Sequence, residues 1–122
     1  MVAGGVTGSV LLDVVEMINL ETLTSCVVNV KLDQTRWKHT GDGDMVYAGE
    51  DDDNGLPSCY NIATGTTISL DNQRAELTSW RTDDNGLYLI GGYPNPSTNI
   101  KTTELITGET TQEGFELKYE TQ

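Results

Sequence analysis

The chain contains few of the residues from which catalytic and metal sites are usually built. Of its 122 residues, one is histidine (His39) and two are cysteine (Cys26 and Cys59). One imidazole cannot form a copper site made of several histidines, and no Cys-x-x-Cys pair or Cys/His cluster indicates zinc. Because no Gly-x-Ser-x-Gly motif supplies a nucleophile for His39, we expect a structural histidine and a protein that is not an enzyme. Two cysteines leave open whether they are buried thiols or one disulfide.

Basic residues are also scarce. Seven Lys and Arg stand against 19 Asp and Glu, for a formal net charge of −12. This balance argues against binding to nucleic acid or to anionic membranes. No apolar run approaches the roughly 20 residues that span a bilayer, and residues 1–10 lack the features of a signal peptide. The sequence therefore favours an acidic protein whose charge keeps it soluble, with a basic partner or bound cations as the alternative, and it gives no cellular compartment.

The most informative feature that is present is an internal repeat with a period of 44 residues. Three segments align at this spacing, and each follows a short apolar run that ends in glycine. The aligned segments are 15–18, 59–62 and 103–106, and the preceding runs are 2–5, 45–49 and 87–92. The repeat predicts one domain over residues 1–122, made of units at about 1–34, 35–73 and 74–122.

Each unit has the pattern of β-strands rather than helices. The runs that end in glycine are apolar on both faces, which is typical of a strand buried on both sides. Phe115, Leu117 and Tyr119 alternate with polar residues, which indicates a strand with one face in solvent. Residues 10–20 are ambiguous alone, but their alignment with the other units favours a strand. We expect strands at about 44–48, 57–62, 66–70, 87–92, 101–106 and 114–119.

Two further landmarks precede the second and third units. Arg36-Trp37-Lys38-His39 aligns with Arg74-Ala75-Glu76-Leu77. Together with the Gly-Gly run and the Glu-bearing strand, this organisation resembles kelch repeats, and the best match is residues 86–92 followed by 103–105. Three departures are that Ala48 replaces the first glycine in one unit, that Leu77 replaces the histidine in another, and that the usual outer-strand Trp is absent.

The resemblance implies an all-β fold, a β-propeller with four-stranded blades, of which this chain carries three. The first blade lacks its inner strand, so the expected total is 11 strands. Natural propellers have about 4 to 8 blades, and three cannot close a ring. We therefore expect that missing chain completes the ring, or that two copies form a six-bladed homo-oligomer about a twofold axis.

The resemblance also implies a function in protein–protein interaction through loops at the rim of the propeller. The expected binding residues are mainly acidic and would suit a basic protein partner. They are Asp42, Asp44, Glu50, Asp51, Asp52, Asp53, Asp83, Asp84, Tyr93 and Asn95. We expect the acids before and after the second strand of each unit to lie near one rim.

The alternative is a structural or extracellular building block that binds calcium. Calcium prefers several carboxylate oxygens, which the run at residues 50–53 offers. That run does not have the spacing of an EF-hand. We therefore expect no cofactor, with calcium as the one candidate ion.

Overall fold

The computed structural model describes residues 1–51, 54–84, 86–95 and 98–121. All regular secondary structure in this part of the chain is β, as the sequence predicts. It contains no helix long and apolar enough to cross a membrane. The strands form four sheets, and none of the sheets built from these residues closes on itself.

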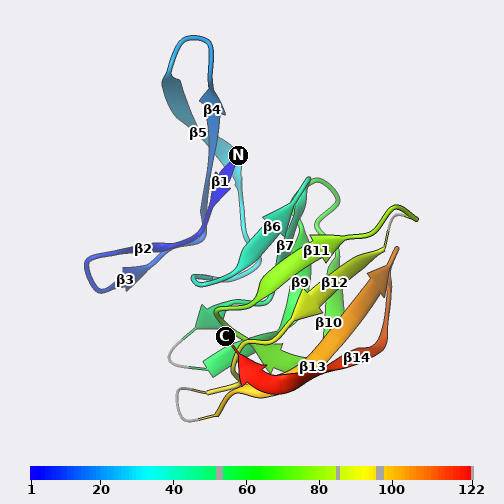
Figure 1. Cartoon of the computed structure of the whole chain (residues 1–122). Helices are drawn as coiled ribbons and strands as arrows, with labels where there is room; N and C mark the ends of the chain where they lie inside the picture. Colours follow the sequence, from blue (N-terminus) through cyan, green and yellow to red (C-terminus); the bar gives the residue numbers. More distant parts are fainter. Residues whose placement is uncertain (52–53, 85, 96–97, 122) are drawn as a thin grey trace.

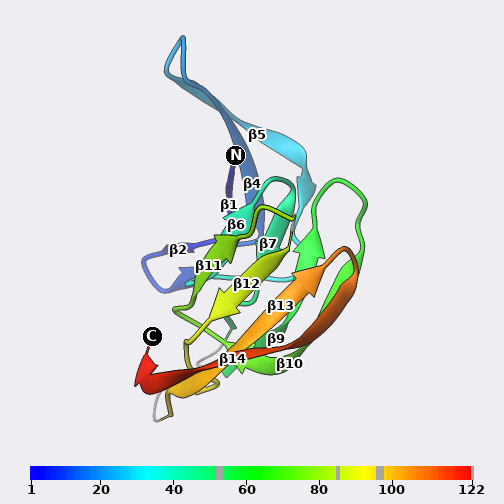
Figure 2. The same cartoon turned by 45° about the vertical axis from the view of Figure 1, so that its right-hand side comes forward.

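The first large sheet has three antiparallel strands in the order β1-β4-β5. The strands are β1 (Val2–Ala3), β4 (Val14–Asn19) and β5 (Thr24–Lys31). Between β1 and β4 the chain forms a separate hairpin of β2 (Val6–Thr7) and β3 (Val10–Leu11). Figures 1 and 2 show the β4–β5 hairpin extending away from the rest of the molecule. This explains why so many of its side chains are exposed.

The second large sheet has its main strands in the order β10-β9-β7-β6. They are β6 (Thr40–Asp42), β7 (Met45–Tyr47), β9 (Asn54–Asn61) and β10 (Thr67–Arg74), and the short β8 (Glu50–Asp51) also pairs with β9. All pairings are antiparallel, and consecutive main strands are neighbours. The sheet is therefore a simple meander.

The third large sheet repeats this meander in the order β11-β12-β13-β14. Its strands are β11 (Thr78–Arg81), β12 (Leu87–Ile90), β13 (Ile100–Thr107) and β14 (Thr110–Thr121). The six strands expected from the sequence are confirmed, as is the expected strand within residues 10–20. The main strands number three, four and four in the successive sheets, as expected. The short strands β2 and β8 were not predicted, and within residues 10–20 the structure has two strands, β3 and β4, where one was expected.

The core lies between the large sheets. One apolar layer joins the first and second sheets through Val15, Leu32 and Val46. A larger layer joins the second and third sheets, and its buried members are Tyr47, Ala48, Cys59, Ile68, Leu70, Leu87, Leu89 and Ile106. The second sheet therefore contributes apolar side chains from both faces, which is why its central strands lack a polar side.

The backbone conformation at the end of the second strand is also repeated in the three units. Where the second strand of each unit ends, two successive residues have positive φ. The first of each pair has φ of 69°, 56° and 68° at Gly4, Ala48 and Gly91. The second is a glycine with φ of 98°, 95° and 95° at positions 5, 49 and 92. Ala48 thus takes the same left-handed conformation as the glycines, although this conformation is unfavourable for a residue with a Cβ.

Candidate functional site

The expected rim residues lie at two opposite ends of the sheets. Asp42 and Asp44 come before β7, whereas Glu50 follows it. Likewise Asp83 and Asp84 come before β12, whereas Tyr93 follows it. Since a strand advances about 3.3 Å per residue, these groups are separated by the length of the strand. The expectation that all of them lie near one rim is therefore wrong. Asp52 and Asp53 lie outside the described residues.

At the end formed by the β6–β7 and β11–β12 turns, one acid is neutralised within the chain. Asp42 accepts a hydrogen bond of 2.7 Å from Arg81 Nε, and this bond raises the pKa of the Arg81 guanidinium. Asp84 accepts a hydrogen bond from the Thr82 hydroxyl, which lowers the pKa of its carboxyl group. Asp44 and Asp83 are exposed at the same end. This end therefore presents acidic side chains to solvent.

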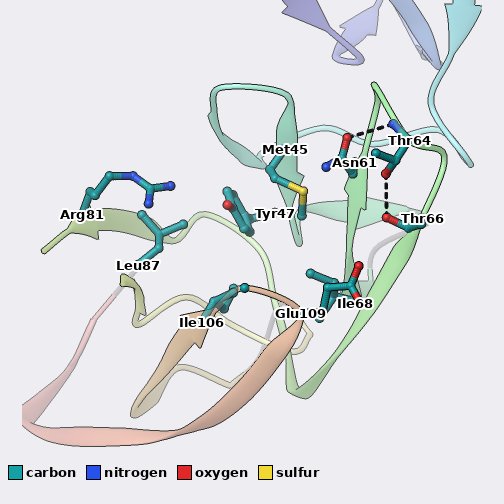
Figure 3. Close-up of a pocket in the computed structure, with 11 residues that line it drawn as sticks. Met45, Tyr47, Asn61, Thr64, Thr66, Ile68, Arg81, Leu87, Ile106 and Glu109 are labelled. Carbon is teal, nitrogen blue, oxygen red and sulfur yellow. Dashed lines mark hydrogen bonds between the residues drawn. The ribbon is translucent and has the colours of Figure 1, made fainter. Parts of the chain in front are cut away.

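A pocket of about 330 Å³ opens between the second and third sheets at this end (Figure 3). Tyr47, Leu87 and Ile106 form its apolar wall, and Arg81 and Glu109 bring opposite charges to it. No sequence pattern predicts this pocket, because its lining comes from strands and turns of two different units. In the described part of the chain, no group of three or more His, Cys, Asp or Glu residues could hold a metal ion.

At the opposite end, Glu50 lies at the centre of a buried polar cluster. Glu50 is 1% exposed, and its carboxylate accepts hydrogen bonds from Trp37 Nε1 at 3.1 Å, Lys38 Nζ at 3.4 Å and the Tyr93 hydroxyl. Lys38 Nζ also donates to the Tyr93 oxygen at 2.6 Å and pairs with Glu76 at 3.0 Å. Burial raises the pKa of Tyr93, and the hydrogen bond with Tyr93 raises that of Lys38.

This Glu50 cluster connects the second and third sheets. Two residues expected to face a partner, Glu50 and Tyr93, instead bond to each other. Of the others at this end, Asp51 accepts a hydrogen bond of 3.0 Å from the Thr35 hydroxyl, and Asn95 forms a bridge with Thr98. Lys38 was not among the expected site residues, although its place inside the Arg-x-x-His motif was the available signal.

Arg36 and Arg74 form a second repeated feature, and both are fully buried. The Arg36 guanidinium donates to the carbonyl oxygens of Ala48 and Ser58, each at 2.9 Å. The Arg74 guanidinium donates to those of Gly91 and Thr102, each at 2.8 Å. Each arginine therefore joins the end of the preceding sheet to the second and third strands of its own unit.

The two arginines differ in their carboxylate partners. Arg36 pairs with Asp33 at 2.9 Å, in the segment just before it. Arg74 pairs with the buried Glu104 at 3.2 Å, which also accepts hydrogen bonds from the backbone N–H groups of Asp71 and Asn72. We call these arrangements the arginine clamps. The sequence marked both arginines as landmarks without revealing what they bind.

The cysteines are free thiols in this structure, with Cys26 exposed and Cys59 buried. Burial raises the pKa of the Cys59 thiol to about 12. Cys59 therefore behaves as a small apolar residue of the core. His39 is partly buried, and its Nδ1 is the one buried side-chain nitrogen or oxygen without a partner among the described residues. Burial lowers the pKa of His39 below its ordinary value of 6.5.

We expect His39 to make the fold sensitive to mild acid. Because its pKa is lower in the folded state, the unfolded chain takes up the proton more readily once the pH falls below about 6.5. The stability due to neutral His39 is therefore present above this pH and lost below it. Between about pH 7 and about pH 5, the free energy of unfolding should fall further for the unmodified chain than for His39→Gln. Urea denaturation at both pH values measures this, and equal losses would contradict it.

Comparison with protein-family models and with curated proteins found no match for this chain.

Proposed function

We propose that the three large sheets are consecutive blades of a kelch-type β-propeller, and that the chain is a non-enzymatic module for protein–protein interaction. The observation that supports this best is the repeated junction between sheets. Sheets two and three are each entered by a buried arginine that bonds to the same two backbone positions. Repeated junctions of this kind are expected when equivalent sheets follow one another around an axis.

The two outer sheet faces support assembly with a second copy. On the third sheet, Tyr88 stacks on Trp80 with ring centroids 6.1 Å apart and contacts Phe115 at 5.3 Å. Trp80 is 59% exposed and Phe115 is 50% exposed. On the first sheet, Val2, Ile18 and Val27 are exposed. Large exposed apolar patches are uncommon on soluble monomers, so we propose that these two faces meet between copies in a six-bladed ring.

The proposed binding surface is the acidic end formed by the β6–β7 and β11–β12 turns. Asp44, Asp83 and Asp84 are exposed there, whereas Glu50 at the other end is buried in its cluster. A basic segment of a protein partner is complementary to this charge. Exposed carboxylates attract such a partner and accelerate its encounter more than they strengthen the final complex.

A lysine-rich peptide should bind at this end and not merely to the acidic chain as a whole. The test compares two double variants that each remove two negative charges. Asp44→Asn with Asp83→Asn should weaken binding at least about threefold, because two nearby attractions are lost. Glu113→Gln with Glu116→Gln, both on β14, should change the affinity for the peptide little. Fluorescence anisotropy at low salt measures both, and equal weakening would contradict a localised site.

A further inference from the structure

The first sheet contains the backbone of an arginine clamp but no arginine. In the second sheet, Ala48 N–H donates to Ser58 O at 2.9 Å, and Arg36 bonds to the carbonyl groups of both residues. In the first sheet, Gly4 N–H donates to Val14 O at the same distance. Gly4 and Val14 stand 44 residues before Ala48 and Ser58. Among the described arginines, none is recorded as bonding to these two carbonyl groups.

In the first sheet, no described chain segment lies where a Cβ added to Gly5, the residue equivalent to Gly49 and Gly92, would point. A Cβ added to Gly49 would lie 2.8 Å from Trp37 O, and one added to Gly92 would lie 2.7 Å from Ala75 O. In both sheets the segment that directly follows the clamp arginine passes at that point. A Cβ added to the equivalent Gly5 meets nothing within 4 Å.

The backbone bridges show the same difference. Trp37 bridges Glu50 in the second sheet, and Ala75 bridges Tyr93 in the third. The equivalent residue after Gly5 is Val6, which pairs with Leu11 on one side. No second bridge of Val6 is recorded in the described part of the chain. Its outer edge is therefore open to a further strand.

The first sheet has a carboxylate, that of Glu16, at the position equivalent to Glu104 in the arginine clamp of the third sheet. Glu104 receives Arg74 and two backbone N–H groups, and Glu16 occupies the equivalent position 88 residues earlier. Glu16 is partly buried, and no hydrogen bond or ion pair of its side chain is recorded in the described structure. Val14 replaces the hydroxyl of Thr102, so this site offers one side-chain acceptor fewer than the filled clamp.

We propose that the open edge of the first sheet, at β1 and Val6, is a binding site for an extended polypeptide segment that carries an arginine. The guanidinium donates to the carbonyl oxygens of Gly4 and Val14 and pairs with Glu16. The backbone of the segment adds a strand to the sheet, a recognised mode of peptide binding. This inference rests on the equivalence of the three sheets within the proposed function, but not on the pairing of two copies.

The test uses a fluorescein-labelled peptide of residues 70–81 of this chain, which contains one clamp arginine and one arginine outside the clamp. Binding to the full chain is measured by anisotropy. Arg74→Gln in the peptide should weaken binding at least about tenfold, because charge-assisted hydrogen bonds and an ion pair are lost. Arg81→Gln, which removes the same charge elsewhere, should change it less than about twofold.

Matched variants of the chain locate the site. Glu16→Gln should weaken binding of the unmodified peptide several-fold, because the carboxylate partner is lost. Glu21→Gln, in the turn of the same hairpin, should leave it unchanged. Equal effects of the two peptide variants, equal effects of the two chain variants, or no binding at about 1 mM peptide would each overturn the proposal.

The mass of the chain in the same samples separates this inference from the proposed ring. Arginine-dependent binding by a chain that stays monomeric supports the strand site and contradicts the pairing of two copies. A dimer that binds all peptides equally supports the pairing of two copies and contradicts the strand site.

Discussion

Arg74→Ala should lower the free energy of unfolding by about 3–5 kcal/mol, because it breaks a buried ion pair by removing one partner. Arg74 is fully buried and bonds to Gly91 O, Thr102 O, Thr102 Oγ1 and Glu104. Without the guanidinium, the carboxylate of Glu104 keeps its two backbone donors but loses the cationic partner that Arg74 provides. The carbonyl groups of Gly91 and Thr102 also lose a donor.

Urea denaturation measures this loss, and Arg81→Ala is the matched control. Arg81 also forms an ion pair, with Asp42, but its side chain is 40% exposed. We expect the control to cost about 0–1 kcal/mol, as exposed ion pairs do. If Arg74→Ala cost no more than the control, the arginine clamps would not hold the sheets together.

Leu89→Ala should lower the free energy of unfolding by about 2–5 kcal/mol, as the truncation of a buried leucine usually does. Leu89 is fully buried on β12, in the apolar layer between the second and third sheets. The truncation would leave a cavity between two sheets, and both would have to move to fill it. The loss therefore lies at the upper part of this range if the sheets cannot approach each other.

Leu20→Ala is the control for this truncation, since Leu20 is 80% exposed at the end of the β4–β5 hairpin. It should change the stability by less than about 0.5 kcal/mol. A loss below about 1 kcal/mol for Leu89→Ala would mean that the layer between these sheets is not the main core.

The strands could be predicted because their signals are local. Alternation of apolar and polar residues, as at Phe115, Leu117 and Tyr119, reports a strand without knowledge of its neighbours. The repeat then extended this information from clear units to the ambiguous residues 10–20, which contain β3 and all of β4. It also identified Ala48 with the glycines of the other units, and φ of 56° at Ala48 agrees with that alignment.

The candidate site could be predicted only in part, because its contacts are long-range. Glu50 begins a run of acids, which on sequence alone indicates a solvated loop. Its burial depends on Tyr93, which lies 43 residues further along the chain, and on Lys38. The sequence does show which acids precede β7 or β12 and which residues follow these strands. The error was to assign both groups to one rim.

We propose that two copies of the chain join into a six-bladed ring, and the mass of the chain in solution shows whether they do. Sedimentation equilibrium at micromolar concentration should give twice the chain mass of 13.3 kDa. Because each copy carries a net charge of −12, association should tighten as salt rises and screens the repulsion over about 10 Å at about 0.1 M. Phe115→Lys should weaken it by placing a charge in the joined face, whereas Leu20→Lys should not. A folded species of 13.3 kDa at every salt concentration would contradict the claim.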